Sequence, residues 1–408
     1  LGFARPEPKI ASLRTLKHQN KKLDQSIVLF FSGPESYTGE DVMELHLHGG
    51  RAVIEGVYSA LSAQKGFRFA ENGEFSKRAV INGRIDLTEA EGINDLINAE
   101  TEAQRDQGLN QLEGALRLQL EKWSNDLKGF GAHIEAYIDF PDEQIPENVL
   151  SDLLQGVEET NRELKEFVDD DRKGEILRSG LKVAVIGPPN VGKSSFVNWL
   201  TKRDIAITSE KAGTTRDIVE AHLDLGGYPV TVADTAGMRE SEDTIEQEGI
   251  RRARSWSESA DLRVLILDPE TAEDANAFSD LLKSGDPVLM NKADRITIVK
   301  KKMSAAYSLV SVKTGYGLES ILSELTTIAK RKMGTQKPTT ITQARHRALL
   351  NDCLTALREA DFGLRNHADL ELIAEDFRSA IYCIGRITGH IDVEDLLDVV
   401  FKEFCIGK

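Results

Sequence analysis

Short, strongly apolar segments alternate with helical or loop segments in the centre of the chain. They read LKVAVIG, VTVAD, RVLILD and PVLMN, at residues 181–187, 230–234, 263–268 and 287–291. Apolar runs without polar alternation are typical of strands that are buried on both faces of a parallel sheet. The pattern therefore predicts an α/β domain with a mostly parallel sheet and helices on both faces.

On either side of this region, apolar residues recur three and four positions apart with charges between them, which predicts amphipathic helices. The first helical block is interrupted by FPDEQIP at 140–146. Before it, residues 26–31 and 42–50 read as two strands separated by a Gly- and Pro-containing loop. The fold class that follows is multidomain: an N-terminal α+β domain, a discontinuous helical domain, and an α/β domain inserted into the helical one.

The changes of pattern also give domain boundaries. We expect an N-terminal domain over 1–82, the two parts of the helical domain over 83–178 and 334–408, and the inserted domain over 179–333. The chain does not begin with Met, so the N-terminal domain is expected to lack its start.

Composition narrows the functional classes. The net charge of −16 gives no global attraction for nucleic acid, so any RNA-binding role has to be local. No apolar run approaches the roughly 20 residues that span a bilayer. The three cysteines form no metal-ligand spacing, and an odd, sparse set fits a reducing compartment rather than a disulfide framework.

The first apolar strand runs into GPPNVGKS at 187–194, which fits the phosphate-binding pattern GxxxxGK[ST]. Glycines let the backbone N–H groups face phosphate oxygens, and the following helix points its positive end at the same anion. Lys193 would reach the β- and γ-phosphates, and Ser194 would hold Mg²⁺. A chance match in a Gly-rich turn is the alternative, which the flanking strand and helix disfavour.

Two further motifs follow strands. Asp234 of the sequence DTAG suits Mg²⁺ coordination, usually through water, and Gly237 offers an N–H to the γ-phosphate. Asp294 of NKAD would accept two hydrogen bonds from guanine, and adenine has no matching donor pair. Alone, these motifs could be a turn and a surface charge cluster. In this order, with the segment 311–313 as a last guanine loop, they predict GTP as the ligand.

These motifs leave open which residue orients water for the hydrolysis of GTP. Met238 stands where Ras-type enzymes place a Gln that orients water. SEKAGTTRD at 209–217 is the expected mobile switch, with Thr214 or Thr215 on Mg²⁺. The segment 238–249 offers four glutamates, and most of them are expected to lie on a solvated helix face. These four are Glu240, Glu242, Glu246 and Glu248.

The chain ends in FCIGK, in which Cys405 is the fourth residue from the end. A lipid anchor is disfavoured, because prenylation needs two aliphatic residues after the Cys and a suitable last residue. A disordered tail and a reactive thiol stay open.

Together these motifs closely resemble the MnmE family, also called TrmE, of tRNA-modification GTPases, over nearly the whole chain. The resemblance rests on GPESYTGEDVMELHLHGG, GEFSKRAVINGRIDLTEAEGINDLI, IEAYIDFPDE, GPPNVGKSS, AGTTRD, DTAGMRE, NKAD and the terminal CIGK. Two departures stand out: a Pro-Gly-Arg segment of the family's N-terminal stretch is absent, and Arg84 stands where relatives can have Lys.

The resemblance implies an N-terminal tetrahydrofolate-binding domain, a cytoplasmic homodimer held by these domains, and the FAD-dependent protein MnmG as partner in a heterotetrameric or larger complex. It implies that the complex adds an aminomethyl or carboxymethylaminomethyl group to carbon-5 of the wobble uridine of certain tRNAs. A tetrahydrofolate derivative, in its 5-formyl or methylene form, would donate the carbon.

The resemblance also implies roles for single residues. Potassium would replace an arginine finger, Glu246 would orient water, and Arg239 would organise the same switch. The expected potassium ligands are Asn190, Ser209, Lys211 and Thr214, and those of Mg²⁺ are Ser194 and Thr215. The expected folate contacts are Glu44, Arg84 and Lys408, although Glu44 and Arg84 could equally form an ordinary ion pair, and Cys405 could be a nucleophile. The expected GTP contacts are Asn190, Val191, Gly192, Lys193, Ser194, Ser195, Ser209, Gly213, Thr214, Thr215, Asp234, Thr235, Ala236, Gly237, Asn291, Lys292, Asp294, Ser311, Val312 and Lys313.

Two other functions compete. The chain could be a GTP-gated switch or scaffold whose partner alone performs the wobble chemistry. It could also be a ribosome-assembly GTPase, but that function needs a basic RNA-binding module, and the sequence offers acidic helices instead.

Overall fold

The computed structural model describes residues 2–139, 147–203, 205–207, 220–234, 256–271, 278–295, 307–334, 339–391, 397, 400–402, 404 and 406–407, with the backbone alone for 147, 148, 220 and 234. The chain forms two compact units, Leu1–Asn94 with Gln111–Arg162 and Leu349–Lys408, and Asp95–Asn110 with Glu163–Ala348. None of the described helices combines the length and the apolar character that crossing a membrane requires.

The first unit opens with an antiparallel sheet in the order β1-β2-β3. Its strands are β1 (Ser12–His18), β2 (Lys21–Phe31) and β3 (Val42–His46). One face is buried, because Leu16, Val28 and Val57 pack together there. Helices that begin in or belong to this unit are α1 (Arg51–Ser62), α2 (Glu74–Ile81), α3 (Leu87–Ile97), α5 (Ala115–Asp139), α6 (Glu147–Val168) and α12 (Leu370–Thr388).

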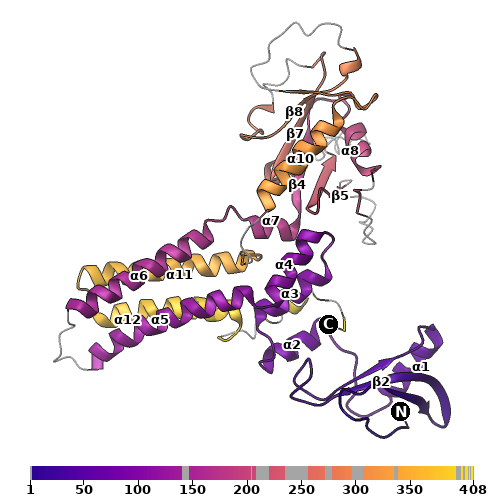
Figure 1. The fold of residues 1–408 in the computed structure, drawn as a ribbon, viewed down its shortest axis with the longest axis vertical. Helices are drawn as coiled ribbons and strands as arrows, with labels where there is room; N and C mark the ends of the chain where they lie inside the picture. The colour runs from indigo at the N-terminus through magenta and orange to yellow at the C-terminus, as the bar shows by residue number, and fades with distance from the viewer. Residues whose placement is uncertain are drawn as a thin grey trace, which may run out of the picture. The chain divides into compact units, whose positions relative to one another are not determined.

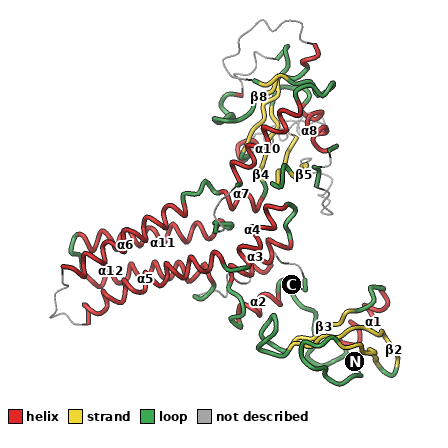
Figure 2. The backbone as a smooth tube through the Cα atoms, viewed as in Figure 1, coloured by secondary structure: helices red, strands yellow, loops and turns green. Residues whose placement is uncertain are grey.

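Helices α5 and α12 run side by side in the helical part (Figures 1 and 2). Their buried residues recur three, four and seven positions apart, as at Leu116, Leu120, Trp123 and Leu127 of α5. The rings of Phe130 and Phe377 lie 6.0 Å apart where the helices meet. The helical periodicity of the sequence therefore corresponds to one buried stripe on each helix.

The described end of the chain packs within the first unit. Phe401 and Phe404 lie with Leu87 and Ala90 in one apolar cluster. Asn72 forms an antiparallel bridge with Ile406. The last described residues are thus held against the segment that precedes α2.

Among the residues that the structure describes, the second unit has a sheet of six strands in the order β5-β6-β4-β7-β8-β9, in which β5 alone is antiparallel to its neighbour. The strands are β4 (Leu181–Ile186), β5 (Glu220–Asp224), β6 (Pro229–Asp234), β7 (Leu262–Leu267), β8 (Val288–Met290) and β9 (Ser308–Leu309). The helical elements of this unit, and the helix that starts in it, are α4 (Glu102–Leu112), α7 (Lys173–Ser179), α8 (Lys193–Thr201), the 3₁₀ turn η2 (Ala293–Arg295), α10 (Leu318–Met333) and α11 (Ala344–Arg365).

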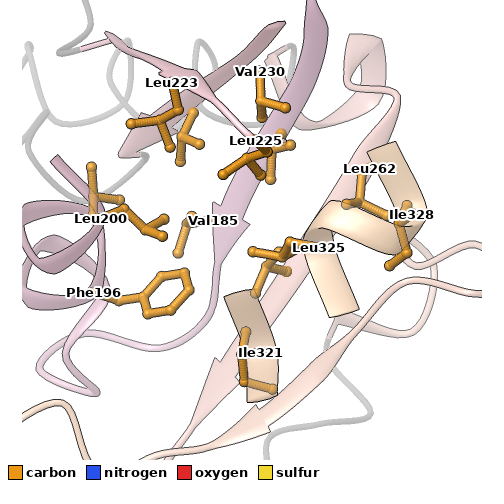
Figure 3. Close-up of a cluster of buried hydrophobic side chains, with 14 of the residues drawn as sticks. Val185, Phe196, Leu200, Leu223, Leu225, Val230, Leu262, Ile321, Leu325 and Ile328 are labelled. Atoms are coloured by element: carbon orange, nitrogen blue, oxygen red, sulfur yellow. The ribbon is translucent and has the colours of Figure 1, made fainter. Parts of the chain in front are cut away.

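The core of this unit lies between the sheet and helices α8 and α10. All six residues of β7 are buried, as expected for a central strand, and five of them are apolar, with Arg263 the exception. Figure 3 shows the side chains that meet there, Val185, Phe196, Leu200, Leu223, Leu225, Val230, Leu262, Ile321, Leu325 and Ile328. The predicted fold class, an N-terminal α+β domain, a discontinuous helical domain and an inserted, mostly parallel α/β domain, is confirmed.

Helix α3 begins with a buried capping box. Asp86 Oδ1 accepts hydrogen bonds from Glu89 N at 2.7 Å and Thr88 Oγ1 at 2.8 Å, and Asp86 N donates to Glu89 Oε2. Asp86 is only 6% exposed, and its Oδ2 has no partner among the described atoms. Burial raises the pKa of this carboxyl to about 6, although the hydrogen bonds from Glu89 and Thr88 oppose the shift.

Asp86→Asn is expected to remove a pH-dependent loss of stability. Because the folded state holds the Asp86 proton more tightly than the unfolded state, stability falls as pH rises from about 4 to about 6, by roughly 2–3 kcal/mol. Asparagine keeps the Oδ1 acceptor and is an equally good cap, but carries no buried charge. Thermal midpoints between pH 4 and 7 should therefore fall less in the variant. Parallel curves for the two proteins would contradict this.

Candidate functional site

The polar motifs gather at one edge of the six-stranded sheet. Because parallel strands point their carboxyl ends to the same edge, β6 ends there with Asp234, and the segments that follow β4, β7, β8 and β9 begin there. These four segments begin at Gly187, Asp268, Asn291 and Val310. The edge is the carboxyl edge of the sheet, and it is the place where open α/β sheets bind ligands.

The loop after β4 has a conformation that requires glycine at two positions. Gly187 has φ 141°, and a Cβ there would lie 2.1 Å from Ile266 O. Gly192 has φ 101°, and a Cβ there would lie 2.4 Å from Asn291 Nδ2. Asn190 between them also has a positive φ of 63°. The loop thus curls closely against β7 and Asn291, directly before the N-terminus of α8.

Lys193 is the first residue of α8 and is 6% exposed. Its Nζ donates to Gly187 O at 2.8 Å and to Pro188 O at 2.7 Å, which holds the ammonium group inside the loop. Asn190, Ser194 and Ser195 are exposed on the same loop and first helical turn. The positive end of a helix, an ammonium group and hydroxyl groups therefore face one place, a combination suited to phosphates and a divalent cation.

Asn291 connects three of these segments. It is 4% exposed, its Nδ2 donates to Val191 O at 2.7 Å, and its Oδ1 accepts from Val312 N at 3.1 Å. Its own N donates to Leu267 O at 2.8 Å. The buried side-chain amide of Asn291 thus connects the phosphate loop, residues 187–194, to the two loops that follow β8 and β9.

Asp294 and Ser311 are also brought together. Ser311 Oγ donates to Asp294 Oδ1 at 2.7 Å, and this bond is the main reason that the pKa of Asp294 lies below its usual value. Nearby Lys313 contributes to the same shift. The exposed Asp294 carboxylate is therefore a charged acceptor at neutral pH, held in direction by a neighbouring loop.

One residue of this edge was not foreseen from the sequence. Asp268 Oδ2 accepts from Lys292 Nζ at 2.5 Å, and Asp268 is 3% exposed. Burial by itself raises the pKa of Asp268, but hydrogen bonds from Lys292 and Thr271 outweigh it and the pKa is lowered. The sequence did contain a signal for this residue, namely its position. Asp268 directly follows a strand, much as Asp234, which was predicted to be a site residue, is the last residue of a strand.

The N-terminal candidates lie in the other compact unit. Glu44 is on β3 opposite Leu29, and its Oε2 lies 3.3 Å from His46 Nε2. Arg84 is exposed, and its side chain lies against Gly39 in the loop before β3. The two side chains therefore have different neighbours, and their expected folate contacts stay predictions.

Several predicted site residues lie outside the described residues. They are Ser209, Lys211, Gly213, Thr214, Thr215, Thr235, Ala236, Gly237, Arg239, Glu246, Cys405 and Lys408, together with the side chain of Asp234. Within the described residues, no group of three or more His, Cys, Asp and Glu side chains is placed to hold a metal ion.

Comparison with known proteins identifies the family. A family model for the MnmE helical domain matches residues 87–405, and one for the GTP-binding protein TrmE N-terminus matches residues 3–84. A tRNA modification GTPase MnmE from Parvibaculum lavamentivorans is 47% identical over 95% of this chain and 87% of its own length.

A second relative of the same name, from Rickettsia bellii, is 46% identical over 97% of this chain and 89% of its own length. Among solved structures, Aquifex aeolicus Era bound to GDP and AlF4⁻ is 22% identical over 43% of this chain and 66% of its own chain. Its TM-score of 0.29 is too low to support the family assignment. On the two family models and these relatives, the chain belongs to the MnmE family of tRNA modification GTPases.

Proposed function

We propose that the chain hydrolyses GTP in a potassium-dependent reaction and acts in a complex that modifies tRNA. The complex adds an aminomethyl or carboxymethylaminomethyl group to carbon-5 of the wobble uridine, in the cytoplasm. The observation that carries the proposal is the Asn291 bridge between Val191 and Val312, with the oriented Asp294 carboxylate beside it.

At the base end of the site, Asp294 selects guanine. Its carboxylate accepts from the N1–H and the exocyclic amine of guanine, whereas adenine would leave the charged acceptor without donors. Ser311 fixes the direction of one oxygen, so that the carboxylate does not have to be ordered when the base arrives.

At the phosphate end, the backbone of the curled loop, Lys193 and the N-terminus of α8 bind the phosphates. The exposed Ser194 hydroxyl fits a Mg²⁺ ligand, because Mg²⁺ prefers oxygen donors and shares them with phosphates. The exposed Asn190 amide would supply one oxygen ligand for potassium, and oxygens of Ser209, Lys211 and Thr214, several of them from the backbone, would supply the others. A cation there offsets the negative charge that develops between the β- and γ-phosphates.

Glu246→Ala is expected to keep GTP affinity and to lose turnover. Met238 cannot orient water, and the resemblance to the MnmE family gives that role to Glu246 and the organisation of the same switch to Arg239. Kd from a fluorescent GTP analogue and phosphate release under saturating GTP separate binding from catalysis. Unchanged turnover would exclude Glu246 from this role, and Glu242→Ala is the matched control.

The N-terminal domain is proposed to bind a tetrahydrofolate derivative through Glu44, Arg84 and Lys408, with Cys405 as the thiol for one-carbon transfer. The bridge between Asn72 and Ile406, and the packing of Phe404 in the same cluster as Leu87, support this proposal because they hold the tail against the N-terminal segment. Arg84 and Lys408 would pair with the carboxylates of the folate, and Glu44 would accept from the pterin amine.

The same domain is proposed to form the homodimer. On the outer face of its sheet, Leu13 is 60% exposed and stands opposite Ile27, which is 46% exposed. Paired apolar side chains on an open sheet face support burial against a second copy. The FAD-dependent MnmG protein is the proposed partner in a heterotetrameric or larger complex that binds tRNA.

The proposal is tested by reconstitution. The chain is incubated with FAD-loaded MnmG, tRNA, GTP, KCl, ammonium or glycine as the nitrogen donor, and methylene tetrahydrofolate or, with a reductant, its 5-formyl form. Wobble nucleosides are analysed by mass spectrometry. The modified uridine is expected only when both proteins and GTP are present. Modification by MnmG alone, or by the mixture without a folate, would contradict the proposed carbon transfer.

A further inference from the structure

Asp268 forms a buried contact that joins the ends of two neighbouring strands. Leu267 of β7 pairs with Met290 of β8, so Asp268 and Asn291 are the next residues of the two strands at the nucleotide edge. Lys292 then reaches back to Asp268 Oδ2. The Asp268 side chain is 4% exposed and that of Lys292 is 25% exposed, so the ion pair is largely shielded from water.

The second carboxylate oxygen of Asp268 is held as firmly as the first. Oδ1 accepts from Glu270 N at 3.1 Å, from Thr271 N at 3.0 Å and from Thr271 Oγ1 at 3.0 Å. The carboxylate therefore cannot turn away from Lys292 without breaking its own turn. A fixed acceptor is what an otherwise flexible lysine needs in order to keep one conformation.

Lys292 occupies a special place on this edge. It lies between Asn291, which binds the phosphate loop, and the turn η2, which carries Asp294. Its backbone has a positive φ of 58°. Because the amine is tied to Asp268, the four-carbon stem is held at the strand ends, two positions before Asp294 along the chain. A lysine stem offers an apolar surface to a flat ring while its charged end is satisfied elsewhere.

We propose that Asp268 is a positioning residue for guanine nucleotides: by holding the Lys292 amine, it keeps the lysine stem in the conformation that supports the bound base. The inference rests on the proposed GTP binding. When Asp268 is lost, Lys292 loses the partner that fixes its amine, and its stem has to be ordered on each binding event. The nucleotide therefore binds more weakly, and we expect this loss of affinity to appear mainly as faster dissociation.

The test is a double-mutant cycle on the full chain, with Asp268→Asn, Lys292→Ala and the combined variant, read out by the dissociation rate and Kd of fluorescent GDP. Asparagine at 268 keeps an acceptor for Thr271 but turns a donor toward the lysine amine. Asp286→Asn is the matched control, because Asp286 likewise accepts backbone N–H groups, from Arg263 and Lys283, at the other end of β8.

Asp268→Asn and Lys292→Ala are each expected to raise the Kd for GDP by about tenfold or more, mainly through faster dissociation. The Kd of the double variant is expected to be only slightly higher than that of whichever single variant binds GDP more weakly. Asp286→Asn should bind like the wild type. Additive losses, or a lower thermal midpoint for Asp268→Asn with an unchanged Kd, would overturn the positioning role. Wild-type protein that does not bind GDP would instead contradict the proposed function itself.

Discussion

Asn291→Ala is expected to reduce guanine nucleotide binding more than any other single truncation on this edge. The side chain is buried and forms one bond to Val191 O and one to Val312 N. Removing it takes away the partner of a buried carbonyl, Val191 O, and of a partly buried amide, Val312 N, at a cost of about 1–3 kcal/mol for the buried group. It also removes the link between the phosphate loop and the loops that follow β8 and β9. The expected loss is roughly 100-fold in Kd or more.

Titration with fluorescent GDP measures this effect, and circular dichroism checks that the variant stays folded. Asn198→Ala is the control, because Asn198 is an exposed asparagine of α8 and removal of its amide leaves the edge intact. A Kd within twofold of the wild type would show that the Asn291 bridge is not needed for binding.

Asp294→Asn is expected to change which base is bound. An asparagine can accept one hydrogen bond and donate another, whereas guanine presents two donors to this residue. Xanthine presents a donor and an acceptor, so it matches asparagine. Affinity for GTP should fall by roughly 100-fold or more, and XTP should become the better ligand.

Competition of GTP, XTP and ATP against one fluorescent nucleotide gives the comparison under a single set of conditions. Ser311→Ala is an informative partner variant, because it removes only the hydroxyl that orients Asp294 and should weaken GTP without favouring XTP. If Asp294→Asn lowered GTP and XTP affinity equally, Asp294 would serve the fold of the loop rather than base selection.

Much of the nucleotide edge could be predicted because its signals are local. The glycines of the phosphate loop and the Asn-Lys-Ala-Asp sequence stand directly after apolar strands, and the acidic residue Asp234 is the last residue of another, β6. Once the strands are recognised as parallel, their carboxyl ends have to meet. The fold class followed from the same reasoning, because β7 is buried throughout and is apolar except at Arg263.

The contacts that were missed depend on partners distant in sequence. Lys292 and Asp268 are 24 residues apart, and only the pairing of β7 with β8 brings them together. Arg263 was missed although its partners are near in sequence: it is a charged residue within an otherwise apolar strand, it is 1% exposed, and its guanidinium donates to the carbonyls of Ser257 and Glu258. Single-sequence patterns do not specify such pairings, because burial and periodicity are the same whichever partner is used.

We propose that the site at this edge hydrolyses GTP with potassium in place of an arginine finger. Phosphate release from GTP is measured in KCl and in NaCl at matched ionic strength, over a range of protein concentrations. Release should be faster in KCl, by an amount that grows with protein concentration as nucleotide domains pair. Equal rates in the two salts would show that potassium does not take the place of an arginine finger.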